Sequence, residues 1–234
     1  MNTLTPPSYP ARPVNGGPLP KARRKRGAWA YEPKVNGWRA WLHVPTGQMF
    51  NRQNEPLSIA GEFSKTAKEL RERFVGMDGD AFVFEWLDVE AFERRHNLGR
   101  GSLVILDVPL PAADYLARQQ SIYSLLVAPG RARSWPFLHE PPPENSLLSF
   151  AYSFTDYGIA SPASEEWQSD EGHYRGEDVD GIHTGWRLLQ AANQTLGAEV
   201  FEGLVAKRVD SLYPVQLRSP DEEFPGWMKH RWAY

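Results

Sequence analysis

Cysteine is absent from the 234 residues of the chain, and its absence excludes several kinds of site. Without thiols there can be no disulfide framework, no thiolate metal site and no cysteine nucleophile. No run approaches the roughly 20 consecutive apolar residues that a membrane span needs. The N-terminus also lacks the apolar stretch of a secretory signal peptide. Together these absences favour a cytoplasmic protein that does not interact with a membrane.

Acidic residues are missing from residues 1–26, although the whole chain carries a net charge of −3. This segment is basic and rich in Pro and Gly, a composition that cannot bury enough apolar surface to offset the entropy of ordering. We therefore expect residues 1–26 to be a disordered basic tail and residues 27–234 to form one domain. The tail could bind nucleic-acid phosphates, or it could only increase solubility.

Apolar patterning predicts a mixture of strands and helices. Alternating side chains indicate strands, and apolar residues at a spacing of three to four indicate helices. We expect helices at 59–74, 115–126 and 186–196, and strands at 38–44, 48–52, 81–86, 103–108, 202–207 and 226–231. Most neighbouring strands are joined by short turns. The predicted fold class is α+β, with largely antiparallel sheets flanked by helices.

Five short polar segments, in a fixed order, hold the candidate chemistry. They are Glu32-Pro33-Lys34-Val35-Asn36-Gly37-Trp38-Arg39, Asn51-Arg52-Gln53-Asn54, Met77-Asp78-Gly79-Asp80-Ala81-Phe82, Phe201–Arg208 and Trp227-Met228-Lys229-His230-Arg231. Together they supply a lysine nucleophile, two carboxylates that could hold a hard cation, and several cations for phosphates. Phosphoryl transfer requires these groups.

The order of these segments resembles the adenylyltransferase domain of the covalent nucleotidyltransferases. That superfamily comprises ATP-dependent DNA ligases, RNA ligases and mRNA-capping enzymes. The chain is most similar to the ligase module of bacterial end-joining DNA ligases. Glu32–Arg39, Glu202–Tyr213 (EGLVAKRVDSLY) and Trp227-Met228-Lys229 carry the similarity, which extends over about residues 28–231.

The resemblance implies a role for each matching residue. Lys34 would attack the α-phosphate of ATP and form a lysyl–AMP intermediate. The cofactor-binding residues would be Glu32, Val35, Asn36, Gly37, Arg39, Arg52, Asp80, Leu106, Glu202, Lys229 and Arg231. Within this set the backbone of Glu32 would read the adenine edge, and Leu106 would lie against the base. Arg39 and Arg52 would contact ribose and phosphate.

The implied metal ion is Mg²⁺ or Mn²⁺, with Asp80 and Glu202 as its ligands. Lys229 and Arg231 match the paired lysines that hold the α-phosphate in the family. Alternation along a strand would place both of them on one face.

The sequence differs from the family pattern in four ways. Asn36 stands where the family has aspartate, Asp80 where it has glutamate, and Leu106 where it has an aromatic residue. The sequence also ends at Tyr234, whereas typical ligases continue into an OB-fold domain. We therefore expect no C-terminal OB-fold here, and we expect a separate OB-fold or end-joining partner chain to supply that part.

The function that the resemblance implies is that of an ATP-dependent DNA ligase catalytic domain. Such a domain seals nicks between a 5′-phosphate and a 3′-hydroxyl in DNA repair, recombination or replication, so its partner would be nicked DNA. One alternative is an RNA ligase or a capping-like enzyme that transfers GMP. Another alternative is a non-catalytic protein that binds nucleotides or nucleic acid.

Overall fold

The computed structural model of the chain describes residues 4–18, 28–75, 85–92, 98–110, 112–124, 133–134, 141–149, 153–155, 158–160 and 181–232. Its strands are β1 (Arg12–Asn15), β2 (Trp29–Val35), β3 (Gly37–His43), β4 (Gln48–Asn51), β5 (Trp86–Phe92), β6 (Leu103–Asp107), β7 (Arg133–Ser134), β8 (Leu147–Ser149), β9 (Ser153–Thr155), β10 (Gly158–Ala160), β11 (Phe201–Arg208) and β12 (Glu223–Arg231). Its helices are the 3-10 turn η2 (Ala60–Phe63), α1 (Ser64–Val75), α2 (Tyr115–Ile122) and α3 (Gly181–Leu196).

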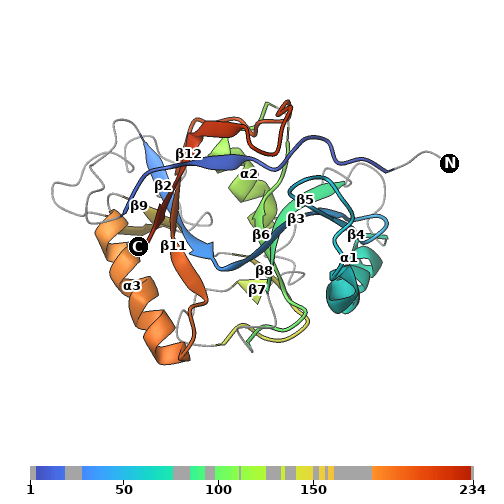
Figure 1. Cartoon of the computed structure of the whole chain (residues 1–234), viewed down its shortest axis with the longest axis horizontal. Helices are drawn as coiled ribbons and strands as arrows, with labels where there is room; N and C mark the ends of the chain where they lie inside the picture. The colour runs from blue at the N-terminus through green and yellow to red at the C-terminus, as the bar shows by residue number, and fades with distance from the viewer. Residues whose placement is uncertain are drawn as a thin grey trace.

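The described strands form two six-stranded sheets that stand side by side (Figure 1). The strand order is β1-β12-β11-β2-β9-β10 in the first sheet and β4-β3-β5-β6-β8-β7 in the second. Most neighbouring strands pair antiparallel, and the parallel pairs are β1 with β12, β6 with β8 and β7 with β8. The α+β class predicted from the sequence is confirmed.

The chain passes from the first sheet to the second at Asn36, between β2 and β3. Glycine is required immediately after it, because a Cβ on Gly37 would lie 2.5 Å from the backbone oxygen of Ala91. The Asn-Gly pair therefore joins two sheets and does not close a hairpin. Lys34 lies at the end of β2, next to this junction.

Two apolar cores support the sheets. Buried residues of β3, β5 and β6 pack with Phe63, Ala67 and Leu70 from the η2–α1 segment. Residues of β2 and β11 pack with Leu189 and Ala192 of α3. Helix α3 thus covers the outer side of the first sheet, and α1 covers the second (Figure 1). The cavity between the sheets is lined by charged as well as apolar side chains.

Most predicted elements are confirmed within a few residues. The hairpin at 38–52 is β3 and β4, the helix predicted at 59–74 is η2 followed by α1, and the C-terminal strands are β11 and β12. The strand predicted at 81–86 lies mostly outside the described residues, and the described strand that follows it is β5, Trp86–Phe92, which the sequence interpretation did not include. All seven residues of β5 are buried, including Asp88 and Glu90. Two acidic residues close together in sequence usually indicate a solvent-exposed segment, so the sequence pattern did not reveal that β5 is buried.

The prediction of disorder for residues 1–26 needs correction over residues 4–18. Residues 12–15 form β1, which pairs parallel with the edge of the first sheet at β12. Ala11 is fully buried against Trp41 and Trp227. Composition concealed this strand because its pairing depends on a partner more than 200 residues away in sequence. Residues 19–27, which hold the other basic side chains, lie outside the described residues.

The described part of the chain forms no OB-fold, and the two open sheets account for its strands. None of the helices described is long and apolar enough to cross a membrane.

Candidate active site

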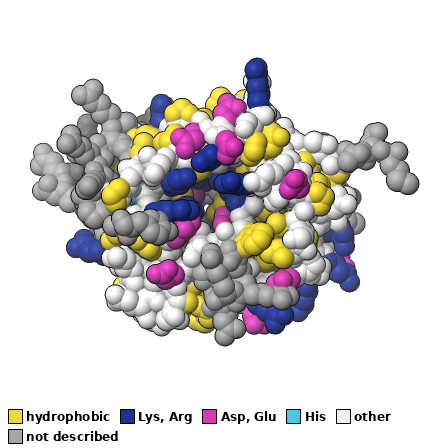
Figure 2. All heavy atoms as spheres, in the orientation of Figure 1, with side chains coloured by type: hydrophobic (Ala, Val, Ile, Leu, Met, Phe, Trp, Pro, Cys, Tyr) yellow, Lys and Arg dark blue, Asp and Glu magenta, His cyan; other side chains and the backbone are white. Residues whose placement is uncertain are grey.

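A cavity of about 460 Å³ opens between the two sheets. Its walls come from β2, β3, β5, β6, β11 and β12, together with the N-terminal segment that contains β1. Figure 2 shows Lys and Arg side chains, with Asp and Glu beside them, gathered around a hollow in the middle of this face. The charged residues that line it are Arg12, Glu32, Lys34, Arg39, Arg52, Glu90, Glu202, Lys207, Lys229 and Arg231.

Lys34 lies in this cavity and donates a hydrogen bond to Glu202 Oε1. Arg231 Nη2 donates to the same carboxylate oxygen at 3.3 Å. The pairing register shifts between Phe201 and Gly203 where β11 meets β2, and Gly203 has a φ of 146°. Such irregularities turn a side chain away from its regular direction. The local backbone of β11 therefore brings the Glu202 carboxylate to the lysine.

Arg39 lies on the second sheet and is held by a buried carboxylate. Its Nε donates to Asp88 Oδ1 at 2.9 Å, and its Nη2 donates to Asp88 Oδ2. The Tyr213 hydroxyl donates to Asp88 Oδ2 at 2.7 Å. The forked contact keeps the guanidinium group charged and fixes its plane. The fixed plane holds the remaining N–H donors of Arg39, a residue that lines the cavity, in one orientation.

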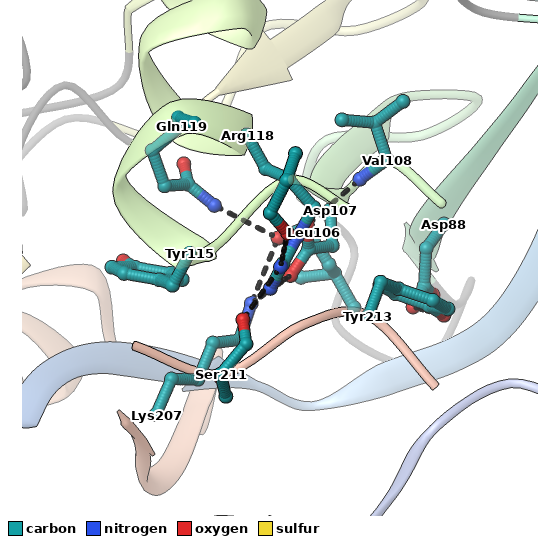
Figure 3. A network of polar contacts seen from close by, with 12 residues as sticks. Asp88, Leu106, Asp107, Val108, Tyr115, Arg118, Gln119, Lys207, Ser211 and Tyr213 are labelled. Carbon is teal, nitrogen blue, oxygen red and sulfur yellow. Dashed lines mark hydrogen bonds and ion pairs between the residues drawn. The ribbon is translucent and has the colours of Figure 1, made fainter. Parts of the chain in front are cut away.

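A buried ionic network closes the inner end of the cavity (Figure 3). Lys207 Nζ lies 2.9 Å from Glu32 Oε2 and 3.1 Å from Asp107 Oδ2, and it also donates to the Leu106 oxygen at 3.0 Å. The Tyr115 hydroxyl donates to Glu32 Oε1 at 2.6 Å. Both carboxylate oxygens of Glu32 are therefore engaged within the protein.

Asp107 stands at the centre of this network. Arg118 Nε donates to its Oδ1 at 2.7 Å, and the Val108 amide donates to the same oxygen at 2.9 Å. Burial alone would raise the pKa of Asp107, but the positive charges of Lys207 and Arg118 outweigh it and hold the pKa below its usual value. The network is thus a fully partnered cluster of charges, the kind that a buried site requires.

Glu90 is the third carboxylate of the cavity, and the sequence interpretation did not include it. Burial raises the pKa of Glu90 to about 7, although the charges of Lys34 and Arg39 act in the opposite direction. Glu202 and Asp88 add to the rise. A carboxylate that titrates near neutrality in a cavity beside a lysine is suited to proton transfer or to cation binding.

Lys229 and Arg231 alternate along β12 and both line the cavity. Burial lowers the pKa of Lys229, and the charges of Arg231, Arg12 and Lys34 lower it further. Cations held this close repel one another, so the free site is electrostatically unfavourable. An anion that bound among them would relieve this repulsion.

Ten of the twelve predicted site residues line the cavity, and these are Glu32, Lys34, Val35, Gly37, Arg39, Arg52, Leu106, Glu202, Lys229 and Arg231. Asn36 is not among the lining residues, and its Nδ2 donates to the Glu199 oxygen at 3.1 Å. This bond ties the junction of the sheets to the start of β11. Asp80 lies outside the described residues.

The sequence interpretation missed Glu90, Lys207 and Arg12 as cavity residues. Glu90 could have been found from the pattern Asp88-Val89-Glu90, which places two carboxylates on one face of a strand. Lys207 was visible as a cation at the end of the β11 segment, but its contacts are all distant in sequence. No local sequence pattern placed Arg12 in the cavity, because β1, the strand that contains it, is formed by pairing with the distant strand β12.

The residues present fit a divalent cation of the Mg²⁺ type. Among the described residues no group of three or more His, Asp or Glu side chains is arranged to hold a metal. Mg²⁺ usually takes only one or two carboxylates and completes its shell with water and substrate phosphates. Glu90 and Glu202 both line the cavity, so they could supply these carboxylates.

Solved structures to which this chain is similar include ligases. The ligase domain of LigD from M. tuberculosis matches over 96% of this chain and 59% of its own length, with a TM-score of 0.52 and 16% identity. The Chlorella virus DNA ligase-adenylate matches over 95% of this chain and 69% of its own, with a TM-score of 0.50 and 14% identity. The chain thus spans little more than half of the first of these.

The two likenesses confirm the predicted fold, a ligase-type nucleotidyltransferase domain. No protein-family model matches the sequence, and no curated protein matches it. Because the identities are low, the likeness establishes architecture, and the chemistry has to be argued from the cavity.

Proposed function

We propose that the chain is an ATP-dependent nucleotidyltransferase that takes AMP onto Lys34. The observation that carries the proposal is the position of Lys34 in a cavity between two sheets, beside Glu202 and Arg231. A nucleophilic amine, a carboxylate and several cations in one enclosed site are what transfer of a charged phosphoryl group requires.

The first step is a nucleophilic displacement at the α-phosphorus of ATP. Lys34 Nζ attacks the α-phosphorus of ATP, an N–P bond forms, the bond between the α-phosphorus and the bridging oxygen breaks, and pyrophosphate leaves. Lys34 passes from an ammonium to the N–H of a phosphoramidate and so loses two protons. One goes to water before the attack, and Glu202 and Glu90 are the carboxylates placed to receive the other. Lys229 and Arg231 would hold the α-phosphate and stabilise the charge that develops on it.

A divalent cation held by Glu90 and Glu202, with Asp80 as a further candidate ligand, would neutralise the phosphate oxygens of bound ATP. The remaining groups position the nucleotide. Leu106 would lie against the base, and Arg39 and Arg52 would contact ribose or phosphate through their guanidinium groups.

We further propose that the acceptor is a nicked DNA strand. The lysyl–AMP would pass its AMP to a 5′-phosphate, and a 3′-hydroxyl would then displace AMP and seal the strand. Support comes from the fold, since both neighbours described above are DNA ligases. RNA ends remain the alternative acceptor, because Asn36 stands where the family has aspartate. A separate chain with an OB-fold could assist the later steps.

The experiment is to incubate the protein with Mg²⁺ and either α-labelled ATP or α-labelled GTP, and to measure label that survives denaturation. We expect label from ATP, and we expect Lys34→Ala to remove it. The exposed Lys65 on α1 provides the matched control, and Lys65→Ala should leave the label unchanged. Label from GTP alone would favour a capping-like transfer, and reversible ATP binding without label would favour a non-catalytic protein.

The acceptor is tested separately with pre-adenylated nicks, which bypass the first step. We expect sealing of nicked DNA in preference to nicked RNA. Sealing of RNA alone would overturn the assignment of DNA as the acceptor and would leave the lysine chemistry intact.

A further inference from the structure

The N-terminal segment runs from one sheet to the other (Figure 1), and its residues 10–13 line the cavity. Strand β1 pairs with β12 of the first sheet, while Ser8 is attached to the second. The Ser8 oxygen accepts from Trp41 Nε1 at 2.9 Å, and its hydroxyl accepts from the Leu217 amide at 3.1 Å. The segment is therefore fixed at two points, one on each side of the cleft.

This arrangement places residues 10–13 on the cavity wall, with Arg12 as their charged member. Arg12 Nη1 lies 3.0 Å from Asp221 Oδ1, and Arg12 Nε lies 3.9 Å from Glu223 Oε1. The Asp221 side chain is 77% exposed, so water screens this pair. Ion pairs of this type contribute little. Arg12 can therefore exchange its carboxylate partner for an anion in the cavity.

Arg12 belongs to the same cluster of charges as the phosphate-binding candidates. Burial and the charge of Arg231 lower the pKa of Lys229, and the charges of Arg12 and Lys34 add to the shift. The strand register places Lys229 between the last two charges. Lys34 lies opposite Gly203, which lies opposite Arg231, whereas Arg12 pairs with Glu223 near the other end of β12. Lys229 lies between them along the strand.

We infer that Arg12 binds the β- and γ-phosphates of the nucleoside triphosphate, an assignment that rests on the proposed function. If the α-phosphate lies between Lys34 and Lys229, the rest of the triphosphate continues past Lys229 towards Arg12. When Lys34 Nζ bonds to the α-phosphorus, the bridging P–O bond breaks and the pyrophosphate takes up the released electron pair. Arg12 is placed to hold that leaving group, and a nucleoside monophosphate would not reach it.

The test compares the binding of ATP, AMP and inorganic pyrophosphate by calorimetry, in the presence of Mg²⁺ and in a Lys34→Arg background that prevents turnover. We expect Arg12→Gln to raise the Kd for ATP and for pyrophosphate about tenfold, the loss typical of one charge-assisted hydrogen bond. The Kd for AMP should change less than twofold. Arg12→Lys keeps the charge and should give an intermediate loss.

Two control variants separate phosphate binding from a structural role. Asp221→Asn removes the carboxylate partner and keeps Arg12, so ATP should bind as before or more tightly. Arg218→Gln removes an exposed arginine outside the cavity and should have no effect. The inference is overturned if Asp221→Asn raises the Kd for ATP as much as Arg12→Gln does, or if Arg12→Gln raises the Kd for AMP as much as the Kd for ATP. It is also overturned if only the affinity for nicked DNA falls.

The outcome is independent of the lysine chemistry. Loss of ATP affinity in Arg12→Gln, together with a wild-type protein that never forms the Lys34 adduct, would support the Arg12 site and contradict the proposed function. If the Lys34 adduct forms in both the wild type and Arg12→Gln with the same dependence on ATP concentration, the proposed function is supported and the Arg12 site is overturned.

Discussion

Glu202 accepts a hydrogen bond from Lys34 in the free protein, and the irregular pairing of β11 is what brings the two side chains together. A carboxylate in contact with the nucleophile can serve it in two ways. It can hold the ammonium group until the nucleotide arrives, and it can then bind a cation or accept a proton. The second role predicts that Glu202 is needed for transfer of AMP to Lys34.

Glu202→Gln should slow the labelling of the protein by ATP at least tenfold, because the amide can neither carry a cation nor accept a proton. The concentration of Mg²⁺ that gives half-maximal labelling should also rise. Glu199→Gln is the matched control, since Glu199 is exposed, lies three residues before Glu202 and does not line the cavity. Faster labelling by Glu202→Gln, with an unchanged Mg²⁺ requirement, would mean that Glu202 only restrains the lysine.

Lys207→Met should lower the free energy of unfolding by about 3–5 kcal/mol, because it leaves Glu32 and Asp107 buried without their shared cation. Chemical denaturation at neutral pH measures this loss. Adding Glu32→Gln to the Lys207→Met protein should recover part of the stability, since it removes the buried carboxylate that loses its cation, whereas Asp107 keeps its pair with Arg118. The neighbouring Arg208 contacts only an exposed carboxylate, so Arg208→Ala should change stability little. Equal losses in the two single variants would contradict the network.

Glu90 should make the free energy of unfolding fall as the pH rises. Its pKa is about 7 in the folded protein, against 4.5 for an ordinary glutamate, so the folded state binds more protons between these values. The contribution of Glu90 to the free energy of unfolding is therefore fully present below pH 4.5. It falls by roughly 3 kcal/mol as the pH rises through 7. Glu90→Gln should unfold like the wild type at pH 5 and should be more stable at pH 8. A constant difference between the two proteins across this range would contradict the assignment.

Leu106→Phe should tighten ATP binding about fivefold, because an aromatic ring in contact with the base is worth about 1 kcal/mol more than an aliphatic side chain. Leu106 lines the cavity and is only partly buried, so the larger ring has room on the open side. Competition between ATP and GTP measures whether selectivity rises as well. Unchanged affinity for both nucleotides would show that the base does not lie against Leu106.

The sequence predicts much of this site because the motifs are local. Lys34, Glu202, Lys229 and Arg231 are each recognisable within a few residues, and the cavity contains all four. The parts that sequence could not predict depend on contacts far apart in the chain. Arg12 reaches the cavity through a strand pairing with β12, and Glu90 is tolerated in a buried strand because Lys34 and Arg39 face it. Propensity and composition carry no information about such partners.

The central claim is that Lys34 receives the nucleotide, and the most direct test is peptide mapping by mass spectrometry after incubation with ATP and Mg²⁺. The account predicts that the peptide containing Lys34 gains the mass of one AMP and that no other lysine is modified. Lys34→Arg should remain unmodified while it keeps its thermal stability. An AMP found on Lys229 or on another lysine, or a wild-type protein that binds ATP and never forms the adduct, would contradict the account.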